Sequence, residues 1–331
     1  MRIDVEAVDE DEPGPAWLGA FERHAEAYLR WYATPGGGPR PTFLECETAI
    51  TRYLPEWLST WKQLCELVGG GDLEARFLSL YRPPPYVHGC SQAVLARPKP
   101  FLVRNYDYAP QLWDAMLLRS SWNGKKVLAV TDCWVGVLDG VNEAGLAISL
   151  SFGGSPEVGV GFGAPLVLRV ALETCQNAHE AARLFRRVPI HMAYNIVMID
   201  RTGDFFTAFT APHRPTIVRR TPASTNHQDR IAWPRHAYAT ATLERERHLY
   251  ARLATPHLEP DALVDAFLMP PLRSIHYDRG FGTLYTAAYR PTEGELVLHW
   301  PGNSWRHTLD QCDVGTRTIE FPDPPGAMVS P

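Results

Sequence analysis

A cysteine directly after a glycine is the residue of this chain best suited to nucleophilic chemistry. The sequence reads GCSQ at residues 89–92 and RNYD at residues 104–107. If a hairpin joins the two segments, the second returns beside the cysteine. A cysteine that becomes the first residue of a chain can use its own α-amino group as its general base. Cleavage between Gly89 and Cys90 would therefore turn Cys90 into a complete nucleophile–base pair.

The bulk composition indicates a soluble globular protein with a real core. The chain has 331 residues, of which 45% are apolar and 21% charged, and its net charge is −5. No cluster of Lys and Arg suggests a nucleic-acid partner. The acidic N-terminus does not read as a signal peptide, and no apolar run approaches the ~20 residues of a membrane helix. These features predict a cytoplasmic protein without nucleic-acid or membrane partners.

The spacing of the cysteines gives no metal or disulfide motif. The six lie at positions 46, 65, 90, 133, 175 and 312, and no two form a CxxC pair. We therefore predict free thiols, no metal and no cofactor. Every cysteine except Cys90 is interpreted as a core residue.

The hydrophobic pattern divides the chain into helical and extended blocks. We expect a loose acidic tail over 1–14, helices over 15–32, 43–68 (bent or divided at Pro55) and 72–81, and a composition boundary near residue 89. Strands are expected at 87–96, 101–106, 127–131, 134–138, 146–152, 194–200, 204–209, 216–220, 283–289 and 296–300. Helices are expected at 166–187 (broken near Asn177), 238–253 and 261–268, and Asp139-Gly140 and Gly145 are interpreted as punctuation between strands. Separate strand and helix blocks favour an α+β fold, with antiparallel sheets and helices packed outside them.

Several segments together resemble the N-terminal-nucleophile (Ntn) hydrolases. The resemblance is to the branch that contains acyl-coenzyme A:6-aminopenicillanic acid acyltransferase, penicillin V acylase and bile salt hydrolase. It spans about residues 86–310 and rests on the order and spacing of segments 89–108, 141–147, 195–203, 224–227, 242–245 and 283–284. It implies a four-layer αββα sandwich over residues 90–331. Residues 1–89 would be a helical prosegment, or small subunit, that stays associated after self-cleavage between Gly89 and Cys90.

The resemblance also implies roles for single residues. Cys90 would be the nucleophile, Asp107 would orient its α-amine, and Arg104 would stabilise the thiolate or a substrate carboxylate. The Asn226 amide and the backbone N–H of Ser151 would form the oxyanion hole, and Arg245 would brace both Cys90 and Asn226. Relatives often carry Asn or Tyr where this chain has Ser151, so only the backbone role transfers. Tyr106 is the predicted substrate contact.

The implied activity is cleavage or transfer of an acyl group through a Cys90 thioester. Water as acceptor gives hydrolysis and an amine gives acyl transfer, and the sequence leaves both open. The substrate would be a small acyl amide or thioester, with acyl-CoA allowed as donor and a homo-oligomer allowed as assembly. Two alternatives stay open: a thiol enzyme without self-cleavage that uses Asp107 or His88 as base, and a catalytically silent binding protein of the same fold.

Overall fold

Two β-sheets packed face to face form the centre of the molecule. The computed structural model describes residues 1–34, 39–87 and 89–322. Within these residues one sheet has nine strands in the order β10-β9-β8-β7-β6-β5-β4-β1-β16. The other runs β11-β2-β3-β13-β14-β15, with β12 paired to β13. The β1–β4 pair is parallel, whereas pairs such as β2–β3 and β7–β8 are antiparallel.

The strands of both sheets are short to medium in length. Their bounds are β1 Arg2–Glu10, β2 Gly89–Leu95, β3 Phe101–Tyr108, β4 Met116–Ser120, β5 Val127–Asp132, β6 Gly136–Asn142, β7 Leu146–Phe152, β8 Tyr194–Asp200, β9 Phe205–Thr210, β10 Ile217–Arg219, β11 Ala223–Ser224, β12 Ile275–His276, β13 Phe281–Arg290, β14 Glu295–Trp300, β15 Asn303–Thr308 and β16 Gly315–Glu320.

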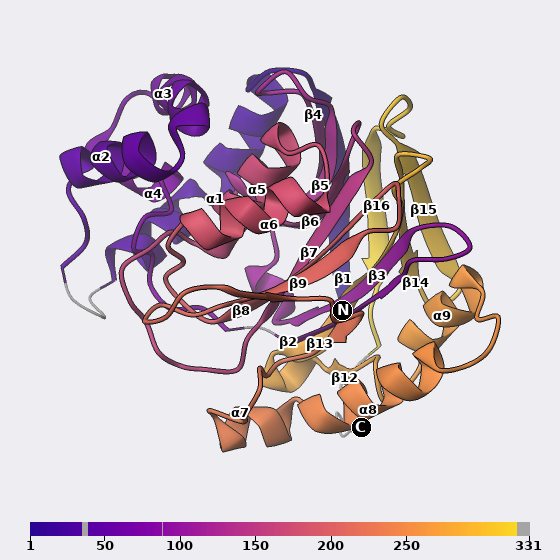
Figure 1. Cartoon of the computed structure of the whole chain (residues 1–331). Coiled ribbons are helices and arrows are strands. Elements are labelled where there is room, and N and C mark those ends of the chain that lie inside the picture. The colour runs from indigo at the N-terminus through magenta and orange to yellow at the C-terminus, as the bar shows by residue number, and fades with distance from the viewer. Residues whose placement is uncertain (35–38, 88, 323–331) are drawn as a thin grey trace, which may run out of the picture.

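Helices cover the outer face of each sheet (Figure 1). Their bounds are α1 Pro15–Ala33, α2 Phe43–Tyr53, α3 Leu58–Leu67, α4 Asp72–Leu78, α5 Ala164–Thr174, α6 Ala178–Arg187, α7 Pro234–Ala239, α8 Thr242–Leu253 and α9 Pro260–Phe267, with 3₁₀ turns at Pro55–Trp57, Pro110–Leu112 and Tyr277–Arg279. Helices α5 and α6 pack on strands of the nine-stranded sheet, and α8 and α9 pack on β2, β3, β11 and β13. The predicted αββα layering is therefore confirmed.

Local sequence signals explain where several helices begin and end. The Thr42 hydroxyl and the Glu45 carboxylate form a capping box at the start of α2. Pro55 follows α2 and separates it from α3, as expected for a residue that cannot continue a helix. The Asn177 side chain caps α6 and so produces the predicted break between α5 and α6.

The expectation of a loose tail over residues 1–14 is wrong. Strand β1 lies inside the nine-stranded sheet, parallel to β4 and antiparallel to the C-terminal strand β16. Val5, Ala7 and Val8 are all at most 4% exposed. The acidic residues between them hide this short apolar pattern from a reading based on charge. The first 89 residues are consequently not purely helical, since they also contribute a strand.

The interpretation of Asp139-Gly140 as a turn is also wrong, because both residues lie in β6. A Cβ at position 140 would lie 2.7 Å from the Cβ of Ala129 and from Cδ1 of Leu172. Glycine is required here by close packing of α5 on the sheet. Asp139 is fully buried and points at a residue of the candidate site described below.

Three further strands were missed by the sequence analysis: β4, β15 and β16. Strand β15 follows β14 across the turn formed by Pro301 and Gly302, the latter with φ of +75°. Its sequence is polar, yet Trp305 and His307 are at most 2% exposed. A strand with only two inward side chains gives too weak an alternation to be recognised.

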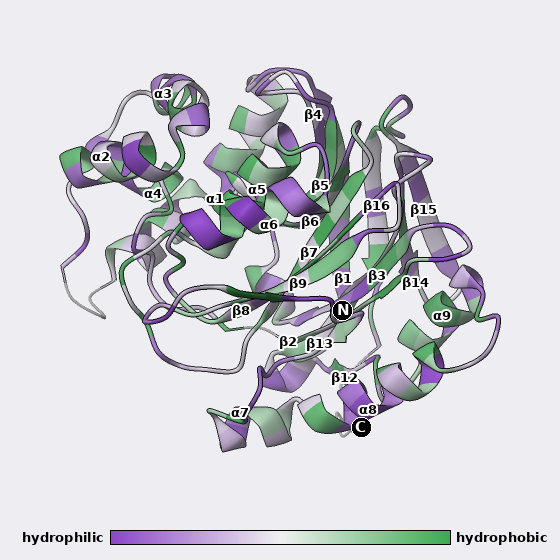
Figure 2. Cartoon of the chain, viewed as in Figure 1, coloured by the Kyte–Doolittle hydropathy of each residue, from purple (hydrophilic) through white to green (hydrophobic). Residues whose placement is uncertain are grey.

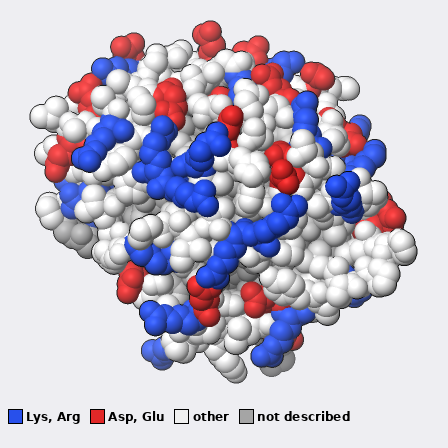
Figure 3. All heavy atoms as spheres, viewed as in Figure 1, with Lys and Arg blue, Asp and Glu red and all other residues white. Residues whose placement is uncertain are grey.

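Hydrophobic and charged residues are distributed as burial requires. Hydrophobic residues run along the central strands, whereas α6 carries hydrophilic residues toward solvent (Figure 2). On the face shown in Figure 3, basic and acidic side chains lie close together, and pairs such as Arg187–Glu56 and Arg220–Asp204 join them. Among the described residues, no helix is long and apolar enough to cross a membrane.

Candidate active site

The β2–β3 hairpin brings the two sequence segments together as predicted. Cys90 lies opposite Tyr106, and Gly89 lies opposite Asp107. Alternate side chains of a strand point to opposite faces of the sheet. Cys90 and Arg104 therefore face the nine-stranded sheet, whereas Asp107 faces the layer formed by α8 and α9.

Arg104 lies against the Cys90 thiol in the fully buried space between the sheets. Its Nη2 donates to Cys90 Sγ at 2.8 Å and to the Leu150 carbonyl at 3.1 Å. Its Nη1 donates to Asp139 Oδ2 at 2.5 Å and to the Tyr285 hydroxyl at 3.0 Å. Both side chains of the Arg104–Asp139 pair are 0% exposed. A guanidinium fixed in this way favours the thiolate over the thiol.

Arg245 connects the backbone of Cys90 to the other polar residues of the site. Its Nη1 donates to the Cys90 carbonyl and to Ser91 Oγ, both at 2.8 Å, and to Asp107 Oδ2 at 3.3 Å. Its Nη2 donates to Asn226 Oδ1 at 2.6 Å. The residue lies in the first turn of α8 and is 3% exposed. It occupies the bracing position that the sequence analysis assigned to it.

Asn226 contacts the other side of Cys90. Its Oδ1 accepts from the Cys90 backbone N–H at 3.0 Å, and its Nδ2 donates to the Phe152 carbonyl at 3.1 Å. Its own N–H donates to Thr242 Oγ1 at 2.8 Å, which ties the residue to the start of α8. The amide is therefore held at the nitrogen that cleavage would turn into an α-amine.

Asp107 lies beside the Gly89–Cys90 junction. Its Oδ1 accepts from Thr283 Oγ1 at 2.6 Å, and its Oδ2 accepts from Arg245. A Cβ at position 89 would lie only 3.1 Å from the Asp107 Cβ. Glycine at this position therefore allows the close approach of the carboxylate to the junction.

Burial sets the protonation state of the two central groups. It raises the pKa of the Cys90 thiol to about 12, against the opposing effect of Arg104. Burial also raises the pKa of Asp107, against the opposing effects of Arg245 and Thr283. In the intact chain Cys90 is consequently a neutral thiol at pH 7, and a base is needed to make it a nucleophile.

The two remaining predicted residues lie close by. Ser151 is in β7, where its hydroxyl accepts from Gln92 and donates to the Thr225 carbonyl. The oxyanion role of its backbone N–H stays a prediction. Tyr106 is 1% exposed, and its ring centroid lies 5.1 Å from the Arg104 guanidinium carbon. His88 lies outside the described residues.

Sequence reasoning missed four residues that support the site. Gln92 donates to Ser151, Ser224 and a carbonyl of β8, and it accepts from Ser149. Asp139 accepts from Arg104 and from the hydroxyls of Tyr285 and Tyr289. A polar residue two positions after Cys90 in an otherwise apolar strand was a usable signal for Gln92. Asp139 gave none, since it was interpreted as part of a turn, and Thr283 and Tyr285 are ordinary strand residues.

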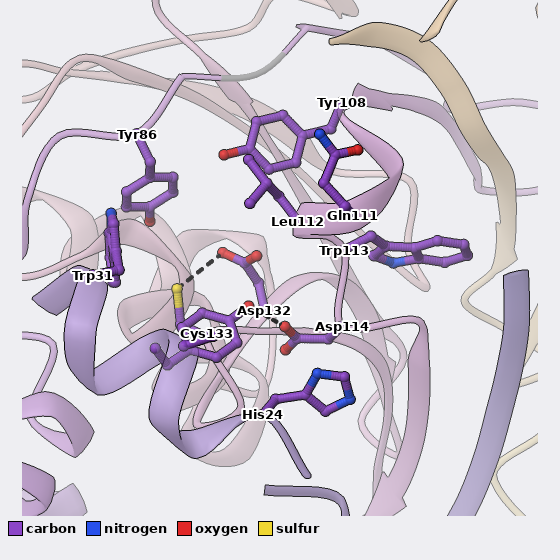
Figure 4. Close-up of a pocket in the computed structure, with 12 residues that line it drawn as sticks. His24, Trp31, Tyr86, Tyr108, Gln111, Leu112, Trp113, Asp114, Asp132 and Cys133 are labelled. Atoms are coloured by element: carbon purple, nitrogen blue, oxygen red, sulfur yellow. Dashed lines mark hydrogen bonds between the residues drawn. The ribbon is translucent and has the colours of Figure 1, made fainter. Parts of the chain in front are cut away.

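Two cavities approach the site from different sides. The first, here called the aromatic cavity, has a volume of about 170 Å³ and is shown in Figure 4. It is lined by Tyr28 and Trp31 of α1, by Tyr86, and by Tyr108 and Trp113 after β3. The second has a volume of about 300 Å³ and is lined by residues that include Gly89, Asp107 and Arg245. Cys90 itself is 0% exposed and lies between the two.

Comparison with known proteins places the chain in a family. The sequence model of the acyl-coenzyme A:6-aminopenicillanic acid acyl-transferase family matches residues 95–305. The chain belongs to this family. The match includes Arg104, Asp107, Ser151, Asn226 and Arg245 but begins five residues after Cys90. Membership in the acyl-transferase family confirms the predicted resemblance, whereas the role of Cys90 rests on the geometry around it.

Solved structures similar to this acyl-transferase family member come from the same branch. Penicillin V acylase from Agrobacterium tumefaciens is 11% identical, with 67% of this chain and 86% of that chain covered and a TM-score of 0.45. A mutant of the conjugated bile acid hydrolase from Clostridium perfringens is 12% identical, with 71% and 98% covered and a TM-score of 0.39. The Caenorhabditis elegans ortholog of N-acylethanolamine-hydrolyzing acid amidase is 14% identical, with 61% and 92% covered and a TM-score of 0.44. No curated protein sequence matches the chain.

Proposed function

We propose that this protein is a self-processing cysteine amidohydrolase or acyltransferase with Cys90 as its N-terminal nucleophile. One observation carries the proposal. The nitrogen, oxygen and sulfur of Cys90 each contact a different buried polar side chain, namely Asn226, Arg245 and Arg104. A core cysteine with a purely structural role does not need three such partners, because it behaves as a small hydrophobic residue.

The first step would be cleavage of the chain. The Cys90 thiol attacks the Gly89 carbonyl, the C–N bond breaks, and the released nitrogen takes the thiol proton to become the α-amine. Water then hydrolyses the resulting thioester, which leaves a carboxylate on Gly89 and restores the thiol of Cys90. The close approach of Asp107 to the junction, with Gly89 opposite it, supports this step.

Turnover would use the same groups. The free α-amine has a reference pKa of about 7.7–8.0, which suits a base at neutral pH. Held by Asn226 and Asp107, it takes the thiol proton and later protonates the leaving amine. The thiolate attacks the acyl carbonyl of a small amide or thioester, and water or an amine resolves the acyl-enzyme. The Asn226 amide and the Ser151 backbone N–H are the proposed oxyanion donors, each worth about 10²–10³ in rate.

Strand β1 supports the proposal that both fragments stay together. It belongs to residues 1–89, yet it is paired with β4 and β16 of the larger fragment. Helix α1 adds a second attachment, because Trp17 Nε1 donates to the Trp134 carbonyl at 3.1 Å. Cleavage after Gly89 would therefore cut the chain without releasing the small fragment.

Trapping of the acyl-enzyme tests the proposal. Purified protein is mixed with a panel of N-acyl 4-nitroanilides, quenched in acid and weighed by mass spectrometry. We expect release of 4-nitroaniline together with a mass gain equal to the acyl group on residues 90–331. Cys90→Ala should show neither, whereas Cys312→Ala, which alters the partly exposed free thiol, should show both. Acylation of the Cys90→Ala protein at a similar rate would refute the role of Cys90.

A further inference from the structure

The aromatic cavity is close enough to the candidate site to receive part of a substrate. Tyr108, in its wall, follows Tyr106 by two residues, and the two ring centroids lie 5.7 Å apart. Trp113, also in the wall, stacks on Tyr285 at 5.4 Å, and Tyr285 contacts the arginine that holds the Cys90 thiol. One layer of aromatic side chains thus separates the cavity from the reacting group.

Two buried carboxylates form the inner end of the cavity. Asp114 is 8% exposed and has several donors: the Tyr28 hydroxyl, the Trp134 N–H at 3.0 Å and the Thr131 hydroxyl at 3.3 Å. These contacts give Asp114 a structural role, since they join α1 to the turn after β5.

Asp132 is different, because its carboxylate points into the cavity and has almost no donors. It is 5% exposed, and in the described part of the chain its side chain accepts only from the Cys133 thiol, at 3.6 Å (Figure 4). The cavity lining contains neither lysine nor arginine. Arg104 acts on Asp132 from a distance, but its guanidinium is already bonded to Asp139 and Cys90. A buried carboxylate without a cation or a good hydrogen-bond donor is expensive unless a ligand supplies one.

The backbone that carries Asp132 is unusual. The turn after it has positive φ at two consecutive non-glycine residues, Cys133 (+51°) and Trp134 (+60°). Such conformations are retained where the surroundings impose them, and they concentrate at functional sites. The turn fixes the carboxylate at the end of the cavity.

The walls suit a cationic group. The faces and edges of Trp31, Tyr86 and Tyr108 surround the Asp132 carboxylate in Figure 4. Aromatic walls attract ammonium groups through the ring quadrupole, and more strongly in desolvated sites. A volume of about 170 Å³ resembles that of a cavity that holds one benzene molecule, roughly 150 Å³. It fits a short aminoalkyl group and excludes a steroid.

The cavity lies on the acyl side of the first bond that Cys90 would attack. In the intact chain that bond is the Gly89 carbonyl, and the residues before it form its acyl side. Tyr86, three residues upstream, is part of the cavity wall. A later substrate attacked by the same thiol would direct its acyl group the same way.

We propose that the aromatic cavity binds an ammonium group on the acyl portion of the substrate, with Asp132 as its counter-charge. This inference rests on the function proposed above and narrows it to short amine-bearing acyl groups. Burial, reinforced by Asp114, raises the pKa of Asp132 well above its ordinary value, so the empty cavity holds a neutral acid. An incoming ammonium group restores the charge of the carboxylate.

A binding measurement tests the cavity without any need for activity. Calorimetric titration of the Cys90→Ala full-length chain compares butylammonium with neutral 1-butanol, which has the same size. We expect butylammonium to bind at least tenfold more tightly, and Asp132→Asn to reduce the ratio below twofold. Asp310→Asn, at a carboxylate that pairs with Lys126 outside the cavity, should leave the ratio unchanged. Equal binding of the two probes, or a ratio that Asp132→Asn does not alter, would overturn the inference.

Two further measurements keep the outcomes separate. If Asp132→Asn fails to fold, Trp31→Leu takes its place and should lower the same ratio several-fold. With the processed enzyme, 6-aminohexanoyl 4-nitroanilide should exceed heptanoyl 4-nitroanilide at least tenfold in kcat/KM. Faster turnover of the heptanoyl compound would refute the ammonium site and leave the proposed function standing. Turnover of neither compound, together with selective binding of butylammonium, would refute the proposed function alone.

Discussion

Arg245 is the residue on which the largest number of contacts in the candidate site depends. Its guanidinium reaches the Cys90 carbonyl, Asp107 and Asn226 at the same time. A planar group with five donors in fixed directions can do this, whereas the single ammonium of lysine cannot. The site is therefore built on the shape of Arg245 as much as on its charge.

Arg245→Lys should damage both stability and processing. The substitution leaves buried acceptors on Cys90 and Asn226 without donors, so we expect the unfolding free energy to fall by about 2–4 kcal/mol. Cleavage after Gly89 should slow by about 10²-fold, because displacement of the reacting groups by about 1 Å has effects of this size. Urea denaturation and a mass-spectrometric time course measure the two effects. Arg247→Lys, at an exposed position of the same helix, is the control, and equal behaviour of the two variants would contradict the role of Arg245.

Gly89→Ala tests the close contact at the junction. The new Cβ would lie 3.1 Å from the Asp107 Cβ, so the carboxylate or the junction must shift. We expect cleavage to slow by about 10-fold to 100-fold while the fold persists. Gly19→Ala, in α1 with no neighbour within 4 Å of the new Cβ, should be processed at the normal rate. Unchanged cleavage in Gly89→Ala would mean that the contact with Asp107 is not needed.

At the scale of elements, the β2–β3 hairpin and the start of α8 were the most predictable parts of the site. The GCSQ and RNYD segments and the bracing arginine could be recognised because they are local in sequence. Gln92 and Asp139 could not be assigned, because their partners lie 57 to 132 and 35 to 150 residues away along the chain. Strand β1 was missed for the same reason, since its neighbours β4 and β16 are distant. Periodicity reveals which face of an element is apolar, but it does not reveal which distant element covers that face.

Helix α5 contains a buried ion pair whose effect should depend on pH. Arg169 and Glu173 are spaced i,i+4 and are at most 1% exposed, and burial raises the pKa of Glu173 to about 7 against the effect of Arg169. A carboxyl group with a raised folded-state pKa stabilises the fold fully below its unfolded value of 4.5 and loses that contribution as pH rises toward 7.

Glu173→Gln should therefore remove a decline in stability with rising pH. Relative to wild type, its unfolding free energy should increase between pH 4.5 and pH 7, by up to about 3 kcal/mol. Urea denaturation at several pH values measures the difference. Glu66→Gln, at an exposed position of α3, should run parallel to wild type. A constant difference between Glu173→Gln and wild type over this range would contradict the raised pKa.

For the whole molecule, the main consequence of the fold is that the proposed small fragment contributes to the core of the large one. Strand β1 lies within the nine-stranded sheet, and α1 forms one wall of the aromatic cavity. Residues 1–89 would thus remain part of the catalytic unit after cleavage, because they line the space next to the nucleophile.

Val5→Asp should loosen this association. Val5 is 1% exposed, and a buried carboxylate without a partner costs several kcal/mol. We expect the processed fragments to co-elute in gel filtration for wild type and to separate at a lower urea concentration for Val5→Asp. Arg2→Asp alters an exposed residue of the same strand and should elute like wild type. Separation of the wild-type fragments in plain buffer would show that β1 does not hold them together.

The mass of the purified chain under denaturing conditions, beside that of Cys90→Ala, tests the central claim most directly. Cleavage between Gly89 and Cys90 would divide the 37.1 kDa chain into fragments of about 10 and 27 kDa, in proportion to their lengths. We expect these two fragments from wild type and only the intact 37.1 kDa chain from Cys90→Ala. A single intact chain from both proteins would remove the α-amine as base and contradict the assignment of Cys90 as an N-terminal nucleophile.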